Sequence, residues 1–286
     1  MRILLISLLF THLSFASWKL TSYNIRNFDN DPGQGRTNLK ILAALLKEQN
    51  SDVFGFQEIV NKSAFDKLIK DVLPTFDYKT SICGGGGSQK LALAFNPKKF
   101  KFLSTNENLK FSDLDVGECG SLRPLFTVSL QSIETQKIYQ FHLVHLKAGS
   151  SAAAMATRWQ QYKMLKDIMS KSSESDIFLG DFNTTGYILN DKDFDRFQQV
   201  LSSTDFRTSA EQTQCTNFWE GPKNSKEFQP SILDHIVVKD SVFKSIQSVN
   251  VAAHCQKVSC RPVKSSELGA SYEEVSDHCP VQVEFH

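Results

Sequence analysis

The sequence predicts an α/β protein in which β-sheets pack face to face and helices cover them on the outside. Short apolar runs rich in β-branched and aromatic residues recur between Gly, Pro or polar clusters, which is typical of strands. Other segments repeat their apolar residues at helical spacing. These helical segments fall between some of the strands without strict alternation, and such a mixture favours packed sheets with helices outside.

The expected strands, in chain order, cover residues 18–25, 53–56, 76–82, 91–95, 125–130, 138–145, 176–179, 232–238 and 280–285. The expected helices cover residues 38–47, 63–72 and 152–170. Ser63 and Asp66 resemble a capping box at the start of the second helix. No 20–50-residue repeat and no Pro- or Ser-rich linker interrupts these elements, so residues 17–286 are expected to form a single domain.

Residues 1–16 have the pattern of a secretory signal peptide. Arg2 precedes a short apolar run, and small residues surround Ala16, where cleavage is expected. The run is far shorter than the roughly 20 residues of a membrane span. We therefore expect a secreted or periplasmic protein, and the alternative is a first core strand. Removal of this segment takes away one of the 32 basic residues and none of the 31 acidic residues, so the remaining net charge is zero. A uniformly basic, non-specifically binding surface is thereby excluded.

Polar residues that could take part in catalysis or metal binding lie at the ends of the expected strands or within them: Asn24, Glu58, His145, Asp181, Asn183, Asp234, Asp277 and His278. Each has an ordinary structural interpretation when taken alone, for instance Glu58 as a helix cap, His145 as a core histidine or Asp181 as the start of an Asx turn. Their joint arrangement favours a functional site. A carboxylate inside an apolar run, such as Asp234, requires a cation or donor, and a histidine is such a partner.

This residue set suits hydrolysis of a phosphodiester. Carboxylate and amide oxygens without thiolates favour a hard cation, Mg²⁺ in the first place, with Ca²⁺ or Mn²⁺ as alternatives, over zinc. The reaction needs neutralisation of phosphate charge, deprotonation of water and protonation of the leaving oxygen. A metal, a basic residue and a pair of histidine or carboxylate groups can perform these tasks.

Six cysteines are present, and none lies in a C-x-x-C pair, which argues against a zinc ribbon. In an oxidising compartment some of them should form disulfides. We expect Cys83 to pair with Cys119, because this bond would tie the glycine-rich loop 84–87 to the segment that leads to Arg123. Cys279 opens an apolar strand and is expected to be a buried free thiol.

Seven short motifs follow one another in the order seen in the endonuclease/exonuclease/phosphatase superfamily. They are Ser22-Tyr23-Asn24-Ile25-Arg26, Gln57-Glu58, Arg123-Pro124, His145-Leu146-Lys147, Gly180-Asp181-Phe182-Asn183, Leu233-Asp234-His235-Ile236 and Ser276-Asp277-His278-Cys279-Pro280. The chain resembles the secreted deoxyribonuclease I-like branch most. The resemblance runs from Lys19 to Glu284 and implies a four-layer sandwich of two mixed β-sheets flanked by helices.

The resemblance also implies roles for the residues of the site. Metal binding falls to Glu58 as principal ligand, with contributions from Asn24, Asp181 and Asp277. Phosphate oxygens would be held by Arg123 and Asn183, with Asn24 beside them.

The catalytic roles implied by the resemblance belong to His278, Asp234, His145 and Asp181. His278, oriented by Asp234, would activate water, and His145 would protonate the leaving oxygen, with Asp181 as the alternative base. One position departs from the pancreatic-type enzymes, in which a glutamate supports the first histidine. The comparable segment here offers Gln89, so that His145 either works at a lower pKa or finds another carboxylate.

The expected function is a secreted, monomeric nuclease that acts on DNA, or on RNA, without stable membrane association. A local basic surface for it would come from Arg26, Arg36, Arg123, Lys147 and Arg158. One alternative is a sphingomyelinase or another phosphoester hydrolase of the same superfamily, which would use exposed aromatics such as Trp219 for membrane contact. The other is a binding module without catalysis.

Overall fold

The structure is a computed structural model that describes residues 17–33, 35–112, 119–186 and 192–286. The expected signal peptide at 1–16 lies outside the described residues. Within them, no helix has the length and apolar character needed to cross a membrane.

Two six-stranded mixed sheets form the centre of the molecule. The first sheet has the order β13 (Ile246–Val251), β14 (Val281–Phe285), β1 (Trp18–Asn24), β2 (Val53–Ile59), β4 (Lys90–Phe95) and β3 (Asp77–Thr80). The second has the order β5 (Phe100–Asn108), β6 (Leu125–Ser132), β7 (Ile138–His145), β8 (Asp176–Asp181), β12 (Asp234–Lys239) and β9 (Phe206–Thr208). A separate two-stranded ribbon joins β10 (Asn217–Trp219) to β11 (Gln229–Ser231).

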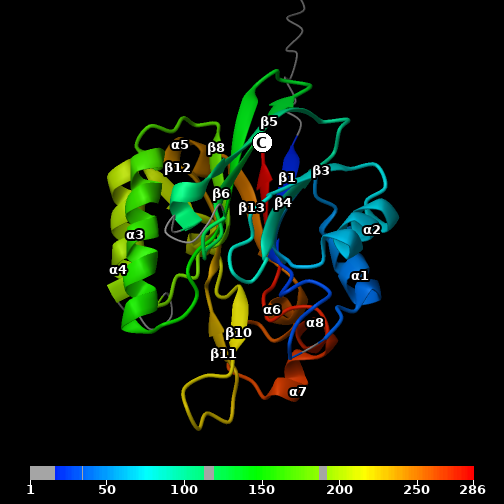
Figure 1. Cartoon of the computed structure of the whole chain (residues 1–286), viewed down its shortest axis with the longest axis vertical. Coiled ribbons are helices and arrows are strands. Elements are labelled where there is room, and N and C mark those ends of the chain that lie inside the picture. Colours follow the sequence, from blue (N-terminus) through cyan, green and yellow to red (C-terminus); the bar gives the residue numbers. More distant parts are fainter. Residues whose placement is uncertain (1–16, 34, 113–118, 187–191) are drawn as a thin grey trace, which may run out of the picture.

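Helices cover the outer face of each sheet, so the four-layer sandwich is confirmed (Figure 1). On the first sheet lie α1 (Leu39–Gln49) and α2 (Lys62–Val72), and on the second lie α3 (Ala152–Met169) and α4 (Lys192–Thr204). The short helices α5 (Asp240–Phe243), α6 (Ala253–Lys257), α7 (Ser265–Leu268) and α8 (Ala270–Glu273) connect the later strands. The cap of α2 differs from the expected one: Asn61, rather than Ser63, accepts the hydrogen bond from the backbone of Ala64.

The inner faces of the two sheets share one apolar core. Trp18 and Leu20 of the first sheet meet Phe141 and Leu179 of the second in this layer. The sheets approach so closely at Gly55 that a Cβ atom there would lie 2.5 Å from Leu179 Cδ1. Burial of apolar area at about 25 cal/mol per Å² makes this layer the main source of stability.

Three disulfides join all six cysteines. The expected bond between Cys83 and Cys119 is confirmed. The expectation of a free thiol at Cys279 is wrong, because this residue is bonded to Cys255 of α6. Both sulfurs belong to a separate apolar cluster below the sheets, so an apolar environment is no sign of a free thiol here.

Candidate active site

Strand register brings the candidate residues of the second sheet into one row. Strand β7 runs parallel to β8 and pairs His145 with Asp181. Strand β12 runs antiparallel to β8 and pairs Asp234 with the same Asp181. In the first sheet, β1 runs parallel to β2, so that Asn24 at its end pairs with Gln57, next to Glu58. The ends of strands from both sheets therefore meet at one edge of the sandwich.

Asn24 holds the two carboxylates of this edge together. Its Nδ2 atom donates to Glu58 Oε1 at 3.0 Å and to Asp181 Oδ2 at 3.0 Å. Its Oδ1 atom accepts a hydrogen bond from the backbone N–H of Arg26 at 3.0 Å. In this arrangement the amide orients the carboxylates and turns its oxygen toward the backbone.

Glu58 owes its position to an irregularity in β2. The register between β2 and β4 shifts between Phe56 and Ile59, and Glu58 has a left-handed backbone with φ 66°. Such bulges re-aim a side chain at the edge of a sheet. Glu58 Oε2 accepts a hydrogen bond of 2.8 Å from the backbone N–H of Asn27, so both carboxylate oxygens have a donor.

His278 contacts the buried carboxylate of Asp234. Its Nδ1 lies 2.7 Å from Asp234 Oδ2, and its Nε2 lies 3.8 Å from Asp181 Oδ2. Its backbone N–H donates to Ser276 Oγ, whose hydroxyl donates to the carbonyl of Asn24. Ser276 thus couples this histidine to the first sheet, a role that sequence reasoning missed although the residue lies within a quoted motif.

His145 lies between Glu58 and Asp181, and its environment differs from that of His278. Its Nε2 is 3.6 Å from Glu58 Oε1 and 3.5 Å from Asp181 Oδ2. Its buried Nδ1 has no hydrogen-bond partner in the described part of the chain. Gln89 does not support it, because the Gln89 amide donates to Asn27 Oδ1 instead. Of the two outcomes expected from the departure at this position, the lower pKa is the one that the structure favours.

Burial and mutual charge shift the pKa values of the site. Burial lowers the pKa of His145 well below its ordinary value, and the charges of Arg123 and His278 add to this effect. Burial also opposes protonation of His278, but Asp234 and Asp181 outweigh it and hold its pKa well above the ordinary value. Burial raises the pKa of Asp181 to about 6 and also raises that of Glu58.

The two candidate phosphate-binding residues Arg123 and Asn183 are anchored to the loop that follows His145. Arg123 donates from Nε to the carbonyl of His145 and from Nη2 to that of Leu146, which leaves Nη1 without a hydrogen bond to any described residue. Asn183 Nδ2 donates to the same Leu146 carbonyl at 3.1 Å. Extended geometry ends at Asp181, because Asn183 has φ 50° and donates its N–H to Asp181 Oδ1 in an Asx turn.

Two further charged residues differ in their surroundings from the rest of the site. Asp277 is one-third exposed and lies 3.9 Å from Arg26 Nε, outside the close group of Glu58, His145 and Asp181. Arg158 was expected on a basic surface, and this expectation is wrong. Its side chain is fully buried, pairs with Asp193 at 3.0 Å and donates to the carbonyl of Lys147.

Glu58, His145 and Asp181 form a group that could hold a divalent cation. Ligand atoms of Glu58, His145 and Asp181 all lie within 4.8 Å of one another, and two of these groups are carboxylates whose ionised form is disfavoured by burial. A cation between them would offset that cost. Two carboxylates and an imidazole nitrogen, without a thiolate, could therefore hold a divalent cation.

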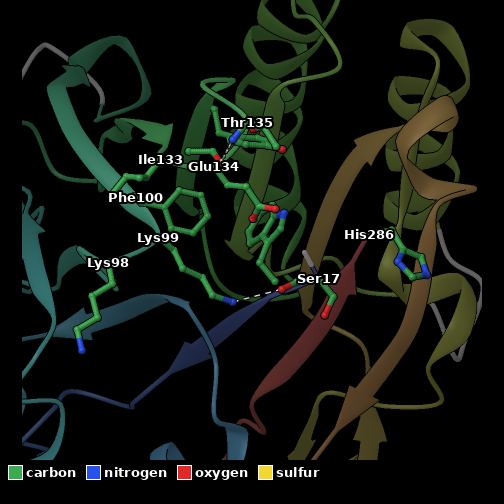
Figure 2. Close-up of a pocket in the computed structure, with 11 residues that line it drawn as sticks. Ser17, Lys98, Lys99, Phe100, Ile133, Glu134, Thr135 and His286 are labelled. Carbon is green, nitrogen blue, oxygen red and sulfur yellow. Dashed lines mark hydrogen bonds between the residues drawn. The ribbon is translucent and has the colours of Figure 1, made fainter. Parts of the chain in front are cut away.

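The cavity shown in Figure 2 belongs to a different part of the molecule. It has a volume of about 160 Å³ and is lined by residues that include Ser17, Lys98, Lys99 and His286. It lies where β1 begins and β14 ends, whereas the site lies where β1 ends and β14 begins. One length of strand, about 20 Å, separates the two.

Solved structures of known proteins share this fold over nearly the whole chain. TDP2 of D. rerio, complexed with a single-strand DNA product, is 15% identical, with a TM-score of 0.65 over 95% of this chain and 99% of that one. An AP endonuclease of Archaeoglobus fulgidus is 13% identical, with a TM-score of 0.64 over 94% and 99%. The mannosyl-6-phosphatase Bt3783 of Bacteroides thetaiotaomicron is 21% identical, with a TM-score of 0.60 over 93% and 98%.

Sequence comparison identifies the family directly. No curated protein matches the chain. The sequence profile of the Endonuclease/Exonuclease/phosphatase family, however, matches residues 21–278, which span every candidate residue from Asn24 to His278. The chain belongs to the endonuclease/exonuclease/phosphatase family.

Proposed function

We propose that this protein is a secreted phosphodiesterase that depends on a divalent cation and cleaves nucleic acid, with DNA as the preferred substrate. The observation that carries the proposal is the position of Asp181. Its carboxylate contacts Asn24 and lies within 4 Å of both histidines, His145 and His278, on the edge where the two sheets meet. The three disulfides are compatible with an extracellular protein.

Glu58 and Asp181 would hold Mg²⁺, or Mn²⁺ or Ca²⁺ in its place, with Asn24 orienting both carboxylates and Asp277 assisting from the rim. When bound, the cation supplies charge neutralisation for the phosphate and its leaving oxygen. Arg123, through its Nη1, and the Asn183 side chain would contact the phosphate oxygens.

His278 and His145 divide the proton transfers of the reaction. The family resemblance assigns water activation to His278 and protonation of the leaving oxygen to His145. Among the protein groups alone, the pKa shifts favour the reverse, because the neighbouring carboxylates raise the pKa of His278, which suits an acid, and burial lowers the pKa of His145, which suits a base. Rate profiles against pH for His278→Gln and His145→Gln separate the two assignments. The variant that loses the alkaline limb of the profile lacks the acid, and the one that loses the acidic limb lacks the base.

Nucleic acid is favoured as the substrate because similar folds act on it. The DNA-bound TDP2 and the AP endonuclease share this architecture over nearly the full chain. The second candidate is a phosphomonoester, since the mannosyl-6-phosphatase shares the fold at a somewhat lower TM-score, 0.60, and a higher identity, 21%. A sphingomyelinase remains the third candidate, because Trp219 is 40% exposed at the end of β10, whose Asn217 pairs with His278.

Cleavage of plasmid DNA, RNA, a sugar phosphate and sphingomyelin vesicles, each with and without chelator, tests the proposal. We expect DNA cleavage that is abolished by chelation and falls steeply with salt, by about 0.9 in log–log slope per contacted phosphate. Full activity in excess chelator would contradict the metal assignment. Efficient cleavage of sphingomyelin or the sugar phosphate, with negligible action on DNA at low salt, would overturn the nuclease assignment within the same family.

A further inference from the structure

The loop before β4 is connected to the site by a chain of hydrogen bonds that the sequence did not indicate. Gln89 Nε2 donates a hydrogen bond of 2.7 Å to Asn27 Oδ1. The backbone N–H of Asn27 in turn donates to Glu58 Oε2 at 2.8 Å. Gln89 is therefore connected through a single residue to the carboxylate that we propose as the principal metal ligand.

The backbone around Asn27 needs such external support. Arg26 has φ 40° and Asn27 has φ 41°, and they face Glu58 with φ 66°. Left-handed conformations are unfavourable for most residues with a side chain, and two in succession persist only where the surroundings hold them. Since the N–H of Asn27 points at Glu58 through this turn, contacts that hold the turn also hold the carboxylate.

The direction of the Asn27 amide explains why residue 89 is a glutamine. Asp31 Oδ2 accepts a hydrogen bond from Asn27 Nδ2 at 3.0 Å. An ionised carboxylate can only accept, so Asp31 fixes the amide with its nitrogen inward and its oxygen toward residue 89. That oxygen requires a donor. Gln89 provides one, whereas a glutamate in its place would put a carboxylate against a carbonyl oxygen.

Gln89 is itself held from the opposite side. Its backbone N–H donates to the carbonyl of Gly84 at 2.8 Å, and a Cβ atom at Gly84 would lie 2.5 Å from the Ser88 carbonyl carbon. The disulfide between Cys83 and Cys119 ties the start of this loop to the segment before Arg123. The loop is thus a fixed support for Asn27 and does not depend on Asn27 for its own position.

The geometry points to Gln89 as a positioning residue that sets the orientation of Glu58 through Asn27. The inference rests on the proposed metal-dependent function. Glu58 is held by Asn24 on one oxygen and by Asn27 on the other, and this double contact selects one orientation of the carboxylate before the cation arrives. Loss of the Gln89 contact frees Asn27, and with it the hydrogen bond to Glu58 Oε2, but leaves the reacting groups in place. This loss therefore weakens the affinity for metal without lowering the rate at saturating metal.

Calorimetric titration of the full chain with Mn²⁺ tests this role without any substrate. For Gln89→Ala we expect a Kd about 3- to 10-fold weaker than wild type, below the 10–100-fold typical of groups bonded directly to a ligand. Gln89→Glu has the same size and reversed polarity, and it should weaken binding at least as much. Gln160→Ala, an exposed amide on α3 in the layer outside the other sheet, is the matched control and should bind as wild type does. DNA cleavage by Gln89→Ala at saturating Mn²⁺ should stay within about twofold of wild type.

The outcomes separate this inference from the function on which it rests. If Glu58→Ala binds Mn²⁺ as tightly as wild type, the proposed metal site is wrong. If Glu58→Ala loses binding while Gln89→Ala and Gln89→Glu both retain wild-type affinity, the positioning role alone is refuted. A lower rate at saturating metal with unchanged affinity refutes it as well, because it would place Gln89 in the chemical step.

Discussion

Buried His235 should make the stability of this protein depend on pH. Its side chain is completely buried in β12, its Nδ1 lies 2.8 Å from Thr208 Oγ1, and its ring packs against Phe182 and Phe197. Burial lowers its pKa from the ordinary 6.5 to about 3. Below pH 6.5 the His235 imidazole is therefore protonated in the unfolded chain, whereas in the folded chain it stays neutral down to about pH 3.

The sign and the size of this effect follow from linkage. Stability rises with pH wherever the unfolded state binds more protons, which for His235 is the interval between about pH 3 and pH 6.5. One pH unit in this interval corresponds to about 1.4 kcal/mol. Relative to pH 7.5, the contribution of His235 to the free energy of unfolding falls by about 1.4 kcal/mol at pH 5.5 and about 2.7 kcal/mol at pH 4.5.

Urea unfolding of wild type and His235→Gln at pH 7.5, 5.5 and 4.5 measures this contribution. The amide can keep the hydrogen bond to Thr208 and does not titrate. Asp181, with its pKa raised to about 6, acts in the opposite direction, but it is present in both proteins and cancels in their difference. We expect the stability advantage of wild type to shrink by about 2.7 kcal/mol between pH 7.5 and pH 4.5.

Substitution of His286, which is exposed at the end of the chain, serves as the control. His286→Gln should follow the wild-type pH dependence throughout. Parallel stability curves for wild type and His235→Gln would refute the argument, because they would show that the buried imidazole accepts a proton without cost.

Three other measurements test the site and the fold. Saturating Mg²⁺ at 100 times its Kd should stabilise wild type by about 2.7 kcal/mol, visible as a rise of about 5 °C in Tm, and Glu58→Ala should show no such rise. Gly180→Ala should lower the free energy of unfolding in urea by about 3 kcal/mol or more, because the backbone has φ 133° and the new Cβ would lie 2.1 Å from a backbone oxygen. Gly55→Ala should cost less, because its Cβ would meet only a side chain, at 2.5 Å. An equal or larger loss of stability for Gly55→Ala would contradict this ranking. Peptide mapping without reduction should recover Cys255 bonded to Cys279, and a free thiol at either position would show the bond to be absent.

The elements that could be predicted from the sequence are those whose side chains are buried. Strands β2, β8 and β12 were recognisable because each contains an apolar run and nearly all of their residues are buried. Strand β5 was not predicted, since it lies at the edge of its sheet and most of its residues are exposed and polar. Helix α4 was overlooked although Phe197, Val200 and Leu201 carry a helical spacing that could have revealed it.

In the candidate site, too, some features could be predicted from the sequence and others could not. The sequence indicated that His145, Asp181 and Asp234 lie at strand termini, and they form a row because β7 and β8 end where the antiparallel β12 begins. The partners of long or flexible side chains could not be predicted in this way. Arg158 and Gln89 reach residues 35 and 62 positions away in the chain, and only the packing of distant loops determines those contacts.

Gly180 shows how closely the fold and the site depend on each other. Its φ of 133° is accessible to glycine, and the carbonyl oxygen of Val144 occupies the space that a side chain would need. Strands β7 and β8 can therefore come together at their last residues, where His145 pairs with Asp181. A side chain at this position would force the two strands apart at the point where the imidazole and the carboxylate meet. The same glycine thus explains both the strand pairing and the 3.5 Å separation of His145 Nε2 from Asp181 Oδ2, so a substitution there should disable the site even in molecules that still fold.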